Sequence, residues 1–212
     1  MKDNKILQIL KKTNAIILDG HFVYASDKHG SVYINKDAIY PHTKEASNVG
    51  KLFAKKFKDL EIDAVVAPAL GGIILSQWTA YHLSKLKKRN ILGLYTEKTL
   101  ERNQIFTRGY DAVVKEKNVL IIEDLVTTGG SVKKVIDSVK ACGGKVVAVG
   151  VMVDRSPGNQ PVTKRVLGAP FFSLGRLPVE VFEVENCPLC KNNIPVNVSV
   201  GHGKKFVEEK IK

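Results

Sequence analysis

Two adjacent acids precede a glycine-rich loop in the stretch Val119–Val139, VLIIEDLVTTGGSVKKVIDSV. The acids, Glu123 and Asp124, end a short apolar run that is typical of a buried strand. After them come the loop residues Thr127, Thr128, Gly129, Gly130 and Ser131, and then a helical pattern. Glycines let several backbone amides turn toward one point, while a helix N-terminus and hydroxyl groups add further attraction for an anion. The spacing therefore predicts a phosphate site at the end of the strand.

The two carboxylates restrict what that ligand can be. A carboxylate beside a phosphate repels it, unless sugar hydroxyls or a magnesium ion lie between them. A ligand with a phosphate, a ribose and a bound metal ion satisfies the whole set. The sequence contains neither G-x-x-x-x-G-K-[ST] nor G-x-G-x-x-G, so a P-loop or a dinucleotide site is not expected. The remaining alternative is an acidic pair that merely follows a core strand and precedes a helix cap.

Strand and helix patterns alternate through the middle of the chain. A short buried strand that ends in a Gly-rich turn is expected at 63–72, and further strands at 90–96, 118–124 and 145–154, with helices at 73–88 and 131–142 between them. Such alternation predicts an α/β fold with a mostly parallel sheet and helices on both faces. Ligands of these sheets bind beyond the carboxyl ends of the strands, which places 69–72, 123–131 and 154–155 around one crevice. The charged stretch 97–117 is expected to be a long loop, and loops of this length are usually functional or disordered. A short amphipathic helix is expected at Ile6–Leu10.

Length and composition indicate one well-cored domain of 212 residues. No apolar run approaches the roughly 18–20 residues of a membrane span, and the start of the chain is a poor signal peptide. With only three cysteines, a reducing cytoplasm is the expected location. The net charge of +12 is compatible with nucleic acid or a polyanionic small substrate, but the basic residues form small scattered groups.

The stretch VLIIEDLVTTGGS closely resembles the motif with which type I phosphoribosyltransferases bind 5-phosphoribosyl-1-pyrophosphate (PRPP). The resemblance implies that Glu123 and Asp124 hold the ribose hydroxyls and that Thr127–Ser131 cradle the 5-phosphate. It also implies a role for Asp124 in managing protons near the reacting ribose, and Mg²⁺ as the cofactor.

The resemblance extends to the orotate phosphoribosyltransferases over roughly residues 15–205. It is carried by Leu18–Asp37, by APALGG at Ala67–Gly72, by Asp154-Arg155 and by CPLC near the C-terminus. It implies transfer of the phosphoribosyl group to orotate, and one domain over 1–212. The expected parts are a hood at about 1–60, a PRPP-binding core at about 61–165 and a C-terminal extension at about 166–212.

Further site residues follow from this resemblance. The residues expected at the pyrophosphate are Ala69, Leu70, Gly71 and Gly72. Those expected at orotate are Thr127, Arg155 and His29. The charged stretch becomes a catalytic lid that carries Lys98, Glu101 and Arg102, and a lid shared between subunits implies a homodimer. Ala25 stands where many orotate enzymes have a base-contacting lysine.

Two other functions fit part of the pattern. A type I enzyme for a purine base would share the phosphate motif, but the N-terminal segment resembles the orotate group. A PRPP-sensing regulator that binds RNA or DNA would account for the basic charge. No helix-turn-helix pattern precedes the fold, so nucleic acid is not expected as a partner.

Cys187 and Cys190 form a C-x-x-C pair. Zinc usually takes four ligands, and only His202 follows closely enough in sequence to assist. The expectation is therefore a reduced structural pair with no metal, and a partial or intersubunit metal site is the alternative.

Overall fold

The computed structural model describes residues 4–24, 26–158 and 160–210. Within this part of the chain, a six-stranded sheet has the order β10-β9-β8-β5-β6-β7. Its strands are β5 (Ala64–Pro68), β6 (Leu92–Lys98), β7 (Gln104–Ile105), β8 (Asn118–Val126), β9 (Lys145–Asp154) and β10 (Phe171–Arg176). The pairs β10–β9, β9–β8, β8–β5 and β5–β6 are parallel, and β7 pairs antiparallel with β6. The expected mostly parallel sheet is confirmed.

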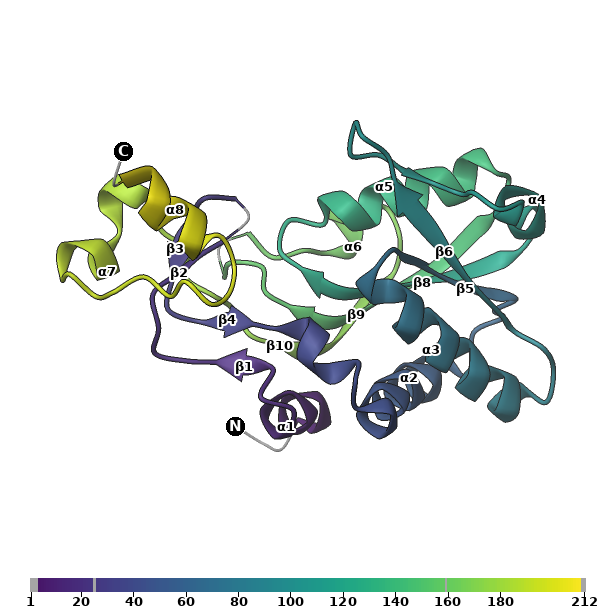
Figure 1. Ribbon diagram of the computed structural model, residues 1–212. Helices are drawn as coiled ribbons and strands as arrows, with labels where there is room; N and C mark the ends of the chain where they lie inside the picture. The colour runs from purple at the N-terminus through teal and green to yellow at the C-terminus, as the bar shows by residue number, and fades with distance from the viewer. Residues whose placement is uncertain (1–3, 25, 159, 211–212) are drawn as a thin grey trace.

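Helices cover both faces of this sheet (Figure 1). One face carries α1 (Lys5–Lys12), α2 (Thr43–Phe57) and α3 (Gly71–Lys87), and the other carries α4 (Tyr110–Val114), α5 (Gly130–Ala141) and α6 (Lys164–Leu167). Alternate strand residues feed the two cores: Leu120 and Ile122 pack toward the first set, while Val119 and Ile121 pack toward the second. Burial on both faces explains why β8 reads as a continuous apolar run.

The strand and helix patterns of the sequence agree with the structure in type and near position. The stretch 97–117 differs from the expected long loop, because it contains β7 and α4. Polar contacts hold it: the Thr96 hydroxyl donates to the Gln104 side chain at 2.7 Å, both being buried, and the Ser138 hydroxyl donates to the Gln104 carbonyl. Because polar contacts hold this stretch in place, its sequence shows no hydrophobic periodicity from which β7 and α4 could be predicted.

A smaller lobe stands at the carboxyl edge of the sheet, at the left of Figure 1. It combines both ends of the chain around a small core of Phe22, Tyr24 and Val179. Its N-terminal elements are β1 (Ile16–Ile17), β2 (Phe22–Val23), β3 (His29–Gly30), β4 (Tyr33–Ile34) and the 3-10 helix η1 (Lys36–Ile39). Its C-terminal elements are η2 (Val184–Asn186), α7 (Pro188–Lys191) and α8 (Gly203–Lys210). From here on, the hood means this lobe of both chain ends. The segment 1–60 expected as a hood also contains α1 and α2, which pack against the sheet.

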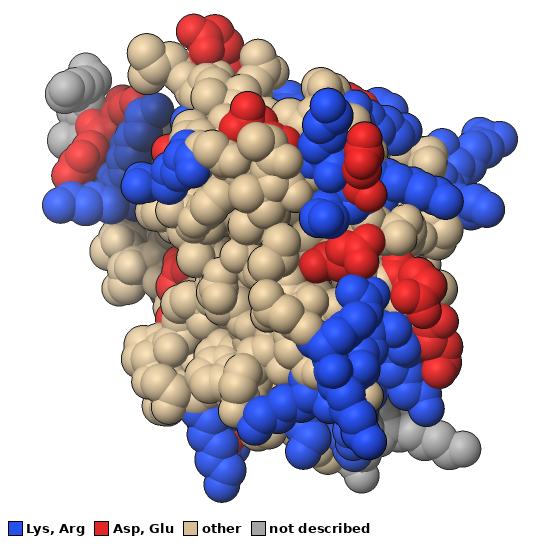
Figure 2. Space-filling model, turned by 90° about the vertical axis from the view of Figure 1, so that its right-hand side faces the viewer, with Lys and Arg blue, Asp and Glu red and all other residues tan. Residues whose placement is uncertain are grey.

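The described helices include none that combines the length and the apolar character needed to span a membrane. Figure 2 shows one face of the molecule, on which basic side chains gather in separate groups with acidic side chains between them. The centre of this face is largely uncharged. The positive charge therefore forms no continuous stripe on the face drawn.

Candidate active site

The glycine-rich loop joins the carboxyl end of β8 to the first turn of α5. Gly129 has a φ of +84°, a conformation that side chains rarely allow, so glycine is required where the chain enters the helix. Thr127, Thr128 and Ser131 are exposed along this turn, and the Gly130 amide donates to the Thr128 hydroxyl at 3.5 Å. The amides and dipole of a helix N-terminus favour an anion, so the loop has the geometry expected of a phosphate site.

This loop forms one wall of a cleft of about 1220 Å³. The hood supplies another wall through Tyr24, Lys28 and Lys36, and Arg155 lines the cleft from the segment after β9. Pockets for one small molecule usually measure roughly 300–1,000 Å³. The cleft is therefore large enough for a phosphorylated sugar together with a second reactant.

The two acids lie at the end of β8, where both are nearly buried. The Lys36 ammonium donates to Oδ2 of Asp124 at 2.5 Å, and the Tyr40 hydroxyl donates to the same oxygen at 3.3 Å. Lys36 itself lines the cleft. Burial lowers the pKa of Lys36, but the charge and hydrogen bond of Asp124 outweigh this and raise it overall. The lysine thus neutralises a buried carboxylate beside the cleft.

Glu123 has a different environment from its neighbour. Burial raises its pKa well above the usual range, and the adjacent charge of Asp124 raises it further. The Asp124 amide donates to Oε1 of Glu123 at 3.1 Å. Within the described part of the chain, Glu123 thus lacks the direct cation that Lys36 provides for Asp124.

The loop between β5 and α3 reaches the same place from the other side. It contains a cis peptide bond between Ala69 and Leu70. A Cβ added to Gly71 would lie 2.3 Å from Oδ2 of Asp124 and 2.9 Å from Nζ of Lys36. Glycine therefore allows the backbone to approach the ion pair, and the structure brings the two expected ligand loops together.

Arg155 lies at the end of the cleft nearest the hood. Its guanidinium lies over the Tyr24 ring, 5.0 Å from the ring centre. Burial lowers the pKa of Arg155, although the Tyr24 hydroxyl acts in the opposite direction. Among the described residues, the buried Nε of Arg155 has no hydrogen-bond partner. A partly buried cation with an unused donor is suited to an anionic ligand.

The expected lid is the hairpin formed by β6 and β7. Arg102 at its tip lines the cleft, and the Lys134 ammonium holds the Arg102 carbonyl at 2.6 Å. Lys98 and Glu101 are exposed on the same hairpin. At its base, Arg108 donates to Glu97 at 2.9 Å. The hairpin therefore brings one of the three expected lid residues to the cleft, with the other two nearby in sequence.

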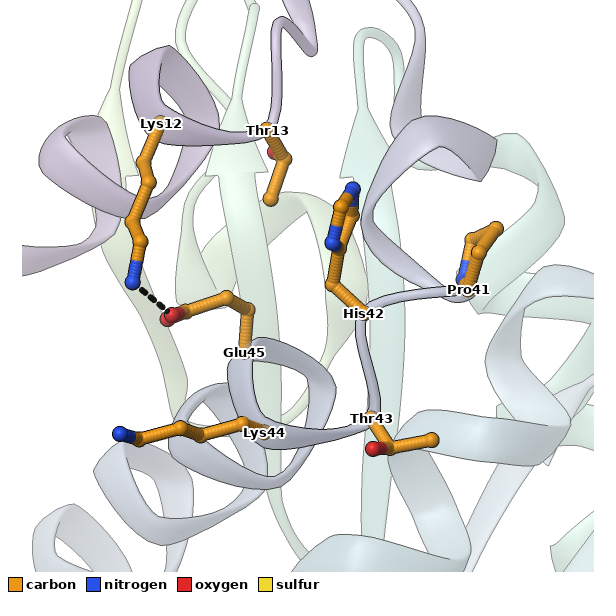
Figure 3. A pocket seen from close by; sticks show the side chains of 7 residues that line it. All are labelled: Lys12, Thr13, Pro41, His42, Thr43, Lys44 and Glu45. Carbon is orange, nitrogen blue, oxygen red and sulfur yellow. Dashed lines mark hydrogen bonds and ion pairs between the residues drawn. The ribbon is translucent and has the colours of Figure 1, made fainter.

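A second, smaller pocket of about 310 Å³ lies between α1 and α2 (Figure 3). Its most prominent contact is the ion pair between Lys12 and Glu45, at 2.5 Å. Thr13, His42 and Lys44 complete much of its lining. It is separate from the phosphate loop and includes none of the residues expected to do chemistry.

Comparison with known proteins shows the family to which the chain belongs. Residues 35–170 match the model of the phosphoribosyl transferase domain. The chain belongs to the phosphoribosyltransferase family. Curated relatives include an orotate phosphoribosyltransferase of Caldanaerobacter subterraneus, 39% identical, with 92% of this chain and 96% of the relative covered. Another, from Thermotoga maritima, is 38% identical, with 94% and 100% covered. The resemblance to orotate phosphoribosyltransferases is confirmed.

Solved structures share the fold of this phosphoribosyltransferase. An orotate phosphoribosyltransferase of Mycobacterium tuberculosis has a TM-score of 0.63 at 19% identity, with 82% of this chain and 97% of that chain covered. An adenine phosphoribosyltransferase of Thermoanaerobacter pseudethanolicus has a TM-score of 0.60 at 19% identity, with 81% and 99% covered. Because an orotate enzyme and an adenine enzyme give similar TM-scores, the fold does not distinguish between the two bases, whereas the sequence relatives named above are orotate enzymes.

One expected ligand residue of this phosphoribosyltransferase lies elsewhere. His29 was expected at orotate, but it is fully buried inside the hood, within hydrogen-bonding distance of His21. It lies beside Cys190 and is not among the residues that line the cleft, so its contact with orotate stays a prediction. Ala25, at the position where many orotate enzymes have lysine, lies outside the described residues.

Sequence reasoning also missed residues that the fold brings to the site. Lys36 and Tyr40 contact Asp124 across 88 and 84 residues, and Tyr24 lies against Arg155. The signal that could have found Lys36 was its place within Leu18–Asp37, the segment that resembles the orotate enzymes. Its partner could not have been chosen, because the contact depends on how the hood folds back onto the sheet.

Proposed function

We propose that this phosphoribosyltransferase transfers the 5-phosphoribosyl group of PRPP to orotate, giving orotidine 5-monophosphate and pyrophosphate. The observation that carries the proposal is the single cleft lined by both the phosphate loop Thr127–Ser131 and Arg155. The relatives named orotate phosphoribosyltransferase, which align with more than nine-tenths of the chain, support orotate as the acceptor. Pyrimidine nucleotide biosynthesis is the corresponding role.

The phosphoribosyl end of the substrate lies against β8 and α5 in this proposal. Thr127–Ser131 bind the 5-phosphate through backbone amides and hydroxyls. Glu123 and Asp124 accept hydrogen bonds from the ribose hydroxyls, and Asp124 helps to manage protons near the reacting carbon. For this, Lys36 exchanges Asp124 for an anionic oxygen of PRPP. Its position on the cleft wall, 2.5 Å from Asp124, supports such an exchange.

The pyrophosphate lies over the loop Ala69–Gly72, whose amides meet its oxygens. The close approach of Gly71 to Asp124 supports this placement, because it brings the loop next to the proposed ribose site. A side chain at position 71 would occupy the space where the two substrate parts join.

Orotate occupies the hood end of the cleft. Arg155 pairs with the orotate carboxylate, and Thr127 contacts the base. The unused donor and partial burial of Arg155 support this role, since a planar guanidinium can hold a carboxylate through two parallel hydrogen bonds. Tyr24 keeps the guanidinium plane in place from the opposite side.

In the reaction, the bond from C1 of the ribose to oxygen breaks and its electron pair leaves with pyrophosphate. An orotate ring nitrogen bonds to C1 and gives up its proton, which Asp124 or the leaving pyrophosphate accepts. Positive charge develops on the ribose while negative charge develops on the leaving group. Fixed charges supply most of the catalysis in such a case. The hairpin closes over the cleft, placing Lys98, Glu101 and Arg102 near the reacting groups and excluding water.

The oxygen-rich donor set at the end of β8 is suited to Mg²⁺. Hard carboxylate oxygens are the ligands that Mg²⁺ prefers, and it is usually held by one or two of them together with substrate phosphates. Glu123 and Asp124 would hold it, and the bound ion would neutralise charge on the pyrophosphate.

A homodimer with shared lids, working in the cytoplasm, completes the proposal. Leu100 at the tip of the hairpin is 98% exposed, which supports contact with a second subunit. Cytoplasmic location is supported by the small number of cysteines.

The test is a phosphoribosyl-transfer assay with purified protein, PRPP and Mg²⁺, in which different bases are offered as acceptors. Orotate consumption is followed by absorbance, with hypoxanthine, guanine, adenine and uracil as parallel acceptors. Rapid turnover of orotate alone is expected. Turnover of a purine without orotate would overturn the choice of base. Binding of PRPP without turnover of any base, together with salt-dependent retention of RNA, would favour a regulator instead.

A further inference from the structure

Four metal-binding side chains meet inside the hood, away from the phosphate loop. They are His21, His29, Cys187 and Cys190, and their ligand atoms all lie within 4.8 Å of one another. His21 directly precedes β2 and His29 begins β3, whereas Cys187 caps α7 and Cys190 lies within it. Up to 169 positions separate these residues in sequence. His21, His29 and Cys187 are buried, and Cys190 is partly buried. The fold itself therefore assembles this cluster.

The distances within the cluster approach those of a tetrahedral site. Zinc with bonds of about 2.05 Å to nitrogen and 2.3 Å to sulfur places a nitrogen and a sulfur about 3.6 Å apart. The observed separations are 3.8 Å from Cys187 Sγ to His21 Nε2, 3.7 Å from Cys190 Sγ to that same nitrogen, and 3.4 Å from Cys190 Sγ to His29 Nδ1. The two nitrogens are 2.7 Å apart and would separate to about 3.3 Å around an ion.

The surroundings of the cluster also fit a closed site. Nδ1 of His21 lies 2.7 Å from the Ile194 carbonyl, which can only accept, so this nitrogen carries the proton and Nε2 is available as a ligand. Such a hydrogen bond to the second ring nitrogen is typical of metal-binding histidines. The Phe206 ring packs edge-on against His29 at 4.7 Å. With four protein ligands and an apolar cover, the site has no open position for a substrate.

We propose that His21, His29, Cys187 and Cys190 bind one structural zinc ion. Two thiolates and two imidazoles in a tetrahedral arrangement favour zinc among common divalent metals. Binding requires both cysteines as thiolates and His29 with Nδ1 deprotonated. This inference is independent of the proposed base and of PRPP binding.

The ion would fix part of the cleft wall. His21 directly precedes β2 and His29 begins β3, and Tyr24, Ser26 and Lys28 from the segment between them line the cleft. The cysteines belong to the C-terminal segment, which is joined to both histidines by the backbone hydrogen bonds from His29 to Phe182 and from Asn197 to His21. A zinc ion therefore joins the two chain ends of the hood and sets the position of the wall that faces Arg155.

The first experiment measures metal in the full chain, purified without an affinity tag under reducing conditions and dialysed against metal-free buffer. About one zinc ion per chain is expected. Replacement by Co²⁺ should give the intense visible bands of a tetrahedral site and a thiolate charge-transfer band. Zinc below about a tenth of an equivalent, with no thiolate band after cobalt addition, would overturn the proposal. So would a disulfide between Cys187 and Cys190, detected by mass after alkylation.

Variants then locate the ion. Cys190→Ser and His29→Gln are expected to weaken metal binding by at least the roughly 10–100-fold that loss of an outer-shell partner causes. Cys142→Ser is the matched control, because Cys142 lies at the end of α5 outside the cluster, and it should keep the metal. Equal loss in the control would overturn the assignment. If the cluster variants fail to fold, a chelator should still lower the Tm of the wild type and of Cys142→Ser, and an unchanged Tm would contradict a structural ion.

Discussion

Lys36 and Asp124 form an ion pair of 2.5 Å that joins the hood to the carboxyl end of β8. The Asp124 side chain is 5% exposed and the Lys36 side chain is 33% exposed. The pair thus lies at the junction of the two lobes, where the proposed ribose site is. Its cation comes from the hood and lines the cleft, so the same contact should affect both stability and substrate binding.

Lys36→Met is expected to lower the free energy of unfolding by about 1–3 kcal/mol, because it leaves a buried carboxylate without its cation. The partial exposure of Lys36 favours the lower end of this range. Lys28→Met is the control, since Lys28 pairs with Glu183 at 2.6 Å and both side chains are exposed, at 41% and 60%. The control should lose less than about 1 kcal/mol. Urea unfolding measures both, and equal losses would contradict the proposed burial effect.

Gly71→Ala should displace this ion pair without unfolding the chain. The added Cβ would lie 2.3 Å from Oδ2 of Asp124, and the atoms it meets are the ends of side chains that can shift. A stability loss of about 1–3 kcal/mol is expected from overpacking, together with a higher KM for PRPP. Gly158→Ala is the control, because nothing lies within 4 Å of its added Cβ. An unchanged KM for PRPP in Gly71→Ala would argue against the proposed pyrophosphate loop.

The central sheet and the phosphate loop could be predicted from the sequence because their signals are local. Continuous apolar runs mark β5, β8 and β9, and the glycines mark the turn into α5. The hood strands have only two residues each, so no periodicity could develop in them. Contacts between residues far apart in the sequence could not be predicted either. Whether His29 met a substrate or Cys190 depended on how two distant chain ends pack, which residue spacing does not encode.

The pH dependence of stability should report the burial of Glu123. Its pKa is raised in the folded state above the usual value of about 4.3, so the folded chain keeps a proton that the unfolded chain releases. Stability from this group is therefore lost as pH rises from about 4 through the folded pKa. The amide of Glu123→Gln does not titrate. The Tm of this variant minus the Tm of the wild type should therefore increase as pH rises through that window.

Glu116→Gln is the control for this measurement, because Glu116 is exposed. Its Tm difference from the wild type should stay small at every pH. A Tm difference for Glu123→Gln that does not change with pH would show that the carboxyl titrates alike in both states. The Glu123→Gln variant should also lose activity, as one proposed ribose ligand is neutralised.

Arg155→Lys is expected to raise the KM for orotate by about 10–100-fold, with little change in the KM for PRPP. Lysine keeps the charge but loses the planar pair of donors, and a hydrogen bond to a charged group contributes about 1.5–3 kcal/mol. The control is Arg165→Lys, which lies exposed on α6. Steady-state kinetics with each substrate varied separates the two constants. Equal increases in both would mean that Arg155 supports the cleft as a whole.

Arg102→Ala should lower kcat by about 10–100-fold while the fold stays intact, because the hairpin tip would no longer bring a cation to the leaving pyrophosphate. Arg102 already lines the cleft, whereas Arg108 at the base of the same hairpin is paired with Glu97. Arg108→Ala is therefore the matched control and should retain most of the turnover. Single-turnover rates with saturating PRPP and orotate would separate the chemical step from product release. If Arg108→Ala lost as much as Arg102→Ala, the effect would come from hairpin stability, and the lid would not act through Arg102.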